Sequence, residues 1–173
     1  MSLKERLDAD LLEEDYEEDE DTQEDKYLTF ILSQEEYGLE IRHVTEIIGI
    51  QNITEVPDMP HYIRGVINLR GKVIPVMDVR LRFGLEEMPY DDRTCIIVIN
   101  IDDQSVGLIV DRVSEVLDIP KGGIESPPKV KRGESSRFIQ GMGKVGDRVK
   151  ILLNAYQLLF DFNKGENSEE LGL

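Results

Sequence analysis

Short apolar runs separated by polar turn residues follow one another along most of this chain. Tyr27–Leu32 and Tyr37–Ile41 flank a polar turn, which predicts a β-hairpin. Cys95–Ile101 and Val106–Val110 show the same arrangement around a turn that begins with two aspartates. The pattern therefore predicts a mainly β protein built from hairpins.

The pattern of the first half recurs in the second half. Residues 27–83 are repeated in diverged form as residues 96–160, first at an offset of 69 positions and then at an offset of 76. At the second offset, Tyr62–Gly65 aligns with Phe138–Gly141. Two units are too few for a solenoid, which needs three or more repeats to cover its ends, so we predict a pair of packed subdomains.

Each half continues with a second hairpin and a short helix. The predicted hairpins are Ile63–Leu69 with Val73–Met77 and Ile139–Val145 with Arg148–Leu153, and the predicted helices are Val79–Phe83 and Ala155–Phe160. The stretches that follow the first hairpins, 44–48 and 113–117, fit either a helical turn or an irregular strand. A β-rich piece that ends at proline comes next in each half, at 50–56 and 119–126.

These elements predict two small five-stranded antiparallel barrels of the SH3 or OB type, packed on a shared core. We expect the domain to span residues 26–164, with the first barrel at about 27–88 and the second at about 93–162. Each half has roughly 60 residues, which is marginal for independent stability, so the halves are expected to depend on each other. Residues 165–173 are expected to form a flexible C-terminus.

Acidic residues are concentrated at the N-terminus. Residues 1–26 contribute −10 to the net charge of −16. A segment of this composition cannot bury enough apolar surface to offset its ordering entropy, so residues 1–25 are predicted to form a disordered tail. The tail is either a solvated extension or a tether for a basic surface.

Composition also narrows the classes of partner. The acidity argues against nucleic acid, because phosphate contacts need a basic face. No apolar run approaches the roughly 20 residues that span a bilayer, and the N-terminus lacks the layout of a signal peptide. The single cysteine, Cys95, rules out an internal disulfide and fits a reducing cytoplasm. We therefore expect a cytoplasmic protein without direct membrane insertion.

No catalytic or metal-binding constellation can be assembled from the sequence. His43 and His61 are the only histidines, and neither has a cysteine or carboxylate at metal-ligand spacing, so both are interpreted as structural. The string Gly141–Gly146 matches a dinucleotide-binding motif, but it precedes a hairpin turn instead of opening a helix. The sequence thus predicts a binding protein that is not an enzyme and uses no cofactor or metal.

Three motifs carry a resemblance to a known family. In order and spacing, Glu36–Ile41, Val44–Ile48 and Gly65–Asp78 resemble the CheW family of chemotaxis coupling proteins, and the resemblance extends from about Tyr27 to Phe160. It implies two five-stranded barrels around a shared core. It also implies a non-enzymatic adaptor that links the cytoplasmic tips of transmembrane chemoreceptors to the regulatory domain of the kinase CheA. The chain shows no kinase, phosphotransfer, dimerisation or receiver segment, so a stand-alone member is expected.

The candidate receptor-binding residues are Val44, Glu46, Ile47, Gly65 and Arg70. Arg70 is the clearest difference between the halves. A tight turn at this place explains the glycine that follows but does not require an arginine. The planar guanidinium group of an arginine suits carboxylates or carbonyls of a partner. Family resemblance places Gly65 near the receptor groove, whereas its recurrence as a strand glycine indicates a bulge. Val44 and Ile47 resemble the receptor-contacting segment of the family, although their spacing also fits core positions.

The candidate kinase-binding residues are Ile124, Glu125 and Val130, which surround a polar loop without a counterpart in the first half. The family pattern there is an end-to-end contact of barrels with the regulatory domain of CheA. The alternative function is a β-barrel that binds a small ligand or nucleic acid. That alternative would need a basic strand face with aromatic residues, and this acidic chain has no tryptophan.

Overall fold

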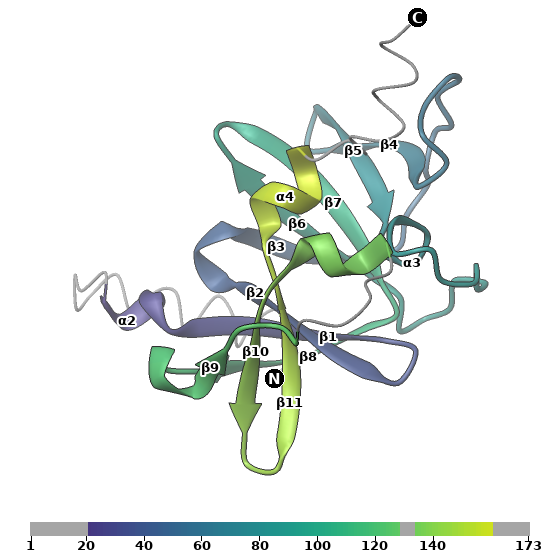
Figure 1. Ribbon diagram of the computed structural model, residues 1–173. Helices are drawn as coiled ribbons and strands as arrows, with labels where there is room; N and C mark the ends of the chain where they lie inside the picture. Colours follow the sequence, from purple (N-terminus) through teal and green to yellow (C-terminus); the bar gives the residue numbers. More distant parts are fainter. Residues whose placement is uncertain (1–20, 129–133, 161–173) are drawn as a thin grey trace, which may run out of the picture.

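The computed structural model of the chain describes residues 21–128 and 134–160 (Figure 1). The strands are β1 Lys26–Leu32, β2 Glu35–Glu40, β3 Val44–Gly49, β4 Ile63–Leu69, β5 Lys72–Asp78, β6 Cys95–Ile101, β7 Gln104–Val110, β8 Arg112–Asp118, β9 Ile124–Glu125, β10 Ile139–Val145 and β11 Arg148–Leu153. The helices are α2 Asp21–Glu24, α3 Val79–Arg82 and α4 Ala155–Phe160, with 3-10 turns η1 Ile41–His43, η2 Lys121–Gly123 and η3 Glu134–Phe138. The four predicted hairpins and the two predicted helices are confirmed. The stretches at 44–48 and 113–117, which fitted a helical turn or a strand, are strands.

The strands form two sheets (Figure 1). The β1 sheet has the order β8-β1-β2-β11-β10-β9, and the β6 sheet has the order β3-β6-β7-β5-β4. Each sheet takes strands from both halves of the chain: the hairpin β1-β2 joins the later strands of the second half, and the hairpin β6-β7 joins those of the first half. The arrangement therefore differs from the predicted barrels at 27–88 and 93–162, because the two halves exchange their first hairpins.

The exchange creates one parallel ladder in each sheet. Tyr37 of β2 pairs in parallel with Ile151 of β11, and Val76 of β5 pairs in parallel with Gly107 of β7. All other ladders are antiparallel, as predicted. Parallel neighbours need a long connection between them, and here a long stretch of the chain separates the paired strands. A hairpin pattern gives no signal for such a pairing.

A single bent segment closes each sheet into a barrel. In the β1 sheet, β8 pairs with β1 at one edge, and the chain then crosses to the other edge, where β9 pairs with β10. In the β6 sheet, β3 pairs with β6, and Thr54 further along forms an isolated bridge to Val66 of β4. Counting each bent segment once, both sheets are five-stranded barrels, as the sequence predicted.

The largest core lies between the two sheets. Along β6, Ile97 and Ile99 belong to this shared core, whereas Ile96 and Val98 belong to a second cluster, inside the barrel that the β6 sheet forms. All four side chains are buried, so β6 has apolar neighbours on both faces. The helices α3 and α4 cover the same core, as their residues Val79, Leu158 and Leu159 pack in it. The predicted shared core is thereby confirmed.

Regular structure is present further towards the N-terminus than predicted. Residues 21–24 form the helical turn α2, and Glu24 lies 2.9 Å from the ammonium of Lys121. The amide of Ile119 donates to the carbonyl of Asp25 at 2.8 Å. The disordered tail predicted for residues 1–25 is therefore wrong for its last residues, and positions 1–20 lie outside the described residues.

Two further predictions concern residues outside the described range, namely the flexible C-terminus at 165–173 and most of the polar loop that begins at Lys129. Among the described residues, no helix is both long enough and apolar enough to cross a membrane.

Candidate partner-binding surfaces

The turn between β4 and β5 presents Arg70 at the tip of a hairpin. Arg70 and Gly71 both have positive φ, 52° and 86°, which is the backbone of a two-residue type I′ turn. The amide of Gly71 donates to Oδ1 of Asn68 at 2.8 Å and braces the turn. Asparagine, aspartate and glycine are the usual residues at the position of Arg70. An arginine is therefore present there against its backbone preference.

The guanidinium of Arg70 binds the carboxylate of Glu46 on β3. Its Nη1 donates to Oε1 at 3.2 Å, and its Nη2 donates to Oε2, so two parallel hydrogen bonds join the planar groups. These bonds raise the pKa of Arg70 above its usual value. The side chain of Glu46 is 11% exposed, while that of Arg70 is 70% exposed. Two of the five N–H donors of the guanidinium are engaged, and the others face solvent.

The structure changes the interpretation of the neighbouring residues on β3. Val44 and Ile47 are buried, at 5% and 7% exposure, and both belong to the shared core. Their side chains are therefore not available to a partner on this surface, and the core interpretation that their spacing allowed matches the structure. The pairing of Arg70 with Glu46 was not predicted either, because the sequence suggested a carboxylate on a partner.

Gly65 has a structural role at the closure of the β6 sheet. It lies at a bulge in β4 with φ of +146°, and a Cβ there would lie 2.1 Å from the carbonyl oxygen of Thr54. Gly141 occupies the equivalent bulge in β10, where a Cβ would lie 2.6 Å from Cγ2 of Ile124. In both halves, glycine lets the bent closing segment pass close to the strand.

The candidate kinase-binding residues are only partly at the surface. Ile124 is half-buried against the small core inside the β1 sheet. Glu125 is exposed and pairs with Lys144 of β10 at 2.7 Å, which lowers the pKa of Glu125. Val130 lies outside the described residues. Of the three, Glu125 is the residue that the structure places on the surface.

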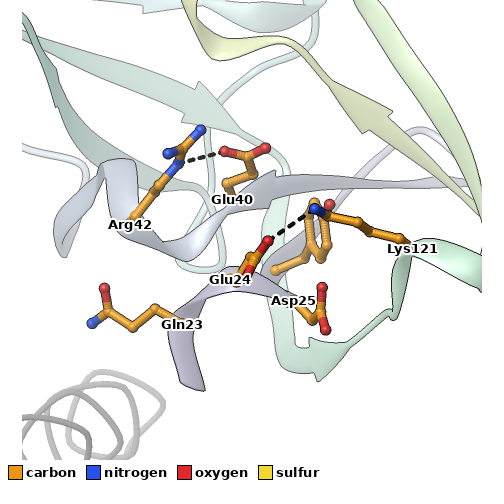
Figure 2. Close-up of a pocket in the computed structure, with 7 residues that line it drawn as sticks. Gln23, Glu24, Asp25, Glu40, Arg42 and Lys121 are labelled. Carbon is orange, nitrogen blue, oxygen red and sulfur yellow. Dashed lines mark hydrogen bonds and ion pairs between the residues drawn. The ribbon is translucent and has the colours of Figure 1, made fainter. Parts of the chain in front are cut away.

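A polar hollow of about 670 Å³ lies beside α2 and the end of β2 (Figure 2). Glu40 is its central group: it accepts from Nε of Arg42 at 2.7 Å and from Nε2 of Gln140 at 3.3 Å, and it lies 3.4 Å from Nε2 of His43. The His43 contact is the largest cause that lowers the pKa of Glu40 to about 2. Figure 2 also shows Lys121 paired with Glu24 across the hollow.

The charged groups of the hollow have a structural role, because they pair with one another within the chain. Its cations Arg42 and Lys121 both pair with carboxylates of the same chain, and Glu40 ties η1 to β10. His61, the other histidine, is exposed, and its ring lies 5.5 Å from that of Tyr62. Within residues 21–128 and 134–160, no group of histidine, cysteine and acidic side chains could hold a metal ion.

Two β-barrels packed on one core, with charged pairs on their surfaces, define a double-barrel domain. A family model described as a CheW-like domain matches residues 26–162, and the chain therefore belongs to the CheW-like family. This family consists of non-enzymatic scaffold proteins of chemotaxis. The resemblance noted in the sequence is confirmed over both barrels.

Individual relatives agree with this assignment. The chemotaxis protein CheW of Klebsiella aerogenes is 36% identical over 148 residues, which cover 86% of this chain and 85% of that protein. The Bacillus subtilis protein of the same name is 36% identical over 78% of this chain and 86% of its own length. The crystal structure of the scaffolding protein TtCheW from Thermoanaerobacter tengcongensis superposes with a TM-score of 0.72 at 40% identity, covering 78% of this chain and 91% of that one.

Replacement of Gly65 by alanine should destabilise the protein. The new Cβ would collide with the Thr54 carbonyl in a backbone conformation that favours glycine, so we expect a loss of about 2–4 kcal/mol in the free energy of unfolding. Chemical denaturation measures this loss. Gly49→Ala is the matched control, because a Cβ at Gly49 would meet nothing within 4 Å, and its effect should stay within about 0.5 kcal/mol. Equal stabilities of the two variants would contradict the closure argument.

Glu40 should make the stability of the protein depend on pH. Its folded-state pKa of about 2 lies below the usual 4.5, so the carboxylate stabilises the fold above pH 4.5 and loses this effect as the pH falls towards 2. Glu40→Gln should cost about 1–3 kcal/mol at pH 7, after allowance for partial exposure, and the difference should shrink at pH 3. Denaturation at both pH values tests this, with the exposed Glu55→Gln as control. A difference that does not vary with pH would refute the role of Glu40.

Proposed function

We propose that this chain couples transmembrane methyl-accepting chemoreceptors to the histidine kinase CheA, as a cytoplasmic adaptor within receptor arrays at the inner membrane. The observation that carries this proposal is the match to the CheW-like family across both barrels. Several relatives at 30–36% identity are named chemotaxis protein CheW. The partners themselves are the part that we infer.

A difference between the two halves supports a receptor-binding role for Arg70. Glu46 has its equivalent in Glu115, which is exposed, but the position equivalent to Arg70 is Gly146. The first half therefore has a guanidinium at this turn position, where the second half has a glycine. Its free N–H donors suit carboxylates or carbonyls on the helical hairpin that forms a receptor tip. In this proposal Glu46 holds the guanidinium in place, and Gly65, Val44 and Ile47 support the strands beneath it.

The second surface that we propose lies at the edge strand β9. Glu125 and Lys144 place one charge of each sign side by side there, with Ile124 half-buried beneath them. A two-residue edge strand leaves most of the neighbouring strand β10 without a ladder partner on that side. This edge is suited to an end-to-end contact with a barrel of the CheA regulatory domain.

The interiors of the barrels support an adaptor over a ligand-binding barrel. Inside the β6 sheet, the buried residues Ile67, Ile74, Val76, Ile96, Val98 and Ile109 pack together. Inside the β1 sheet, Tyr27, Ile119 and Leu152 do the same. Small barrels of this kind are filled by side chains, so recognition takes place on the outer surface.

A reconstituted mixture tests the proposed function. Added to CheA and receptor-containing membranes, the chain should make the autophosphorylation of CheA depend on the receptor, whereas the chain alone should turn over no ATP. Phosphate incorporation from labelled ATP measures both. A pull-down with the CheA regulatory domain and with a receptor cytoplasmic fragment identifies each contact separately. Binding to neither fragment would refute the proposal.

Reversal of the charge at Arg70 should weaken receptor binding on the order of thirtyfold, because a carboxylate would face acceptor groups of the partner. Isothermal titration calorimetry with the receptor fragment measures the change. Glu46→Gln tests whether the guanidinium itself contacts the partner: the amide keeps the shape of the side chain and one acceptor oxygen to hold Arg70, so Arg70 stays exposed and binding should stay within about threefold. Arg93→Glu, at an exposed arginine elsewhere, controls for net charge. If Glu46→Gln weakened binding as much as Arg70→Glu, the guanidinium would act only within the chain.

A further inference from the structure

The two halves build the same corner twice. In the first half, the amide of Asp78, at the end of β5, donates to the carbonyl of Tyr62 at 2.8 Å. In the second half, the amide of Asn154 donates to the carbonyl of Phe138, also at 2.8 Å. In each half, an aromatic residue that precedes the hairpin is thereby held next to the helix that follows the hairpin. At the offset of 76 positions, Tyr62 corresponds to Phe138 and α3 corresponds to α4.

Arg82 of α3 joins these two corners. Its Cζ lies 4.2 Å from the ring centroid of Tyr62 and 4.7 Å from that of Phe138, so it contacts one aromatic residue of each half. Its Nη2 donates to the carbonyl of Leu158 in α4 at 3.3 Å. Leu158 occupies the position in the second half that is equivalent to Arg82 in the first. The side chain of Arg82 therefore contacts its own counterpart in the repeat, at the place where the two halves meet.

The chemistry of an arginine suits this position. A guanidinium is attracted to the face of an aromatic ring, and more strongly when both are removed from water, as here, where Arg82 is 2% exposed. The carbonyl of Leu158 lies in the last turn of α4, whose carbonyls have no donor within the helix and favour a nearby positive charge. Lysine has no planar group that could contact both rings.

The contact is also asymmetric. Where Arg82 lies in the first half, the second half has the apolar Leu158. A guanidinium at the equivalent place would bring a like charge close to that of Arg82 in a buried site. Arg137 also lies over the Phe138 ring, at 4.9 Å, but it belongs to η3 and is not the equivalent of Arg82. Because α3 follows a strand of the β6 sheet and α4 follows a strand of the β1 sheet, this one side chain connects the two barrels.

We propose that Arg82 is a positioning residue that fixes the orientation of one barrel relative to the other. The rings of Tyr62 and Phe138 and the end of α4 hold its guanidinium, and through it α3 and α4 keep one relative placement. A consequence, which rests on the coupling function proposed above, is that Arg82 sets the spacing between the receptor-facing and kinase-facing surfaces.

A distance measurement between the barrels tests this role. Val73 and Val149 are exposed, at 64% and 52%, and occupy equivalent positions on β5 and β11, in different sheets. Spin labels on cysteines at these positions, with Cys95 replaced by alanine, report the distance between the barrels by pulsed electron paramagnetic resonance. Arg82→Met should at least double the width of the distance distribution or shift its mean, and Arg82→Lys should give an intermediate result.

A matched control separates orientation from stability. Ile67→Ala removes a buried side chain inside the β6 sheet, outside the core shared by the two barrels, and should lower the unfolding midpoint without widening the distribution. Wild-type-like distances in the Arg82 variants, or an equal widening in Ile67→Ala, would overturn the proposal. If Arg82→Met does not fold, Arg82→Lys decides the outcome by the same criterion.

The functional consequence has a separate readout. Each Arg82 variant should bind the receptor fragment alone and the CheA regulatory domain alone within threefold of wild type, while receptor-dependent CheA activity falls at least fivefold. A variant with altered distances but full coupling would remove the functional consequence and leave the positioning role. If the wild-type chain binds neither partner, the proposed function fails, whereas the distance measurement still judges Arg82.

Discussion

At the centre of the structure, β1 and β6 are each covered on both faces by apolar side chains. Leu28 and Phe30 of β1 and Ile97 and Ile99 of β6 fill the core between the sheets. Neither barrel alone could cover these faces, and a unit of roughly 60 residues is marginal for independent stability. The exchange of hairpins between the halves follows from this constraint, since it brings both central strands to the same core. The partner-binding surfaces are carried on the outside of this arrangement.

A few ion pairs connect each exchanged hairpin to the strands or helix of the other half. At the parallel ladder between β2 and β11, the ammonium of Lys150 lies 2.7 Å from the carboxylate of Glu36, and the lysine side chain is only 7% exposed. Arg80 of α3 forms two hydrogen bonds with Asp111, at 2.7 and 2.6 Å. Removal of one member would leave a poorly solvated charge, so such pairs specify the arrangement more than they add stability. Arg82 extends the same principle to the contact between the barrels.

Structural features that depend on neighbouring residues could be predicted from the sequence. These features, namely hairpins, turns, terminal helices and bulge glycines, were predicted at nearly their observed positions. Asp78 illustrates the reason, since its carboxylate accepts from the amide of Leu81 and begins α3 within a few residues of itself. Gly65 and Gly141 were also identified as strand glycines from their recurrence alone. The repeat showed that two similar units exist, and the three motifs identified the family.

The sequence by itself thus determined the four hairpins, the duplication, the acidic composition and the family, because each depends on residues close together or on composition. Only the tertiary structure decided which hairpin joins which barrel, that Arg70 pairs with Glu46, and that Val44 and Ile47 are buried. It also placed Arg82 between the halves. These features depend on contacts between residues far apart in the chain, and an apolar or charged side chain carries no local signal of which distant group it will meet.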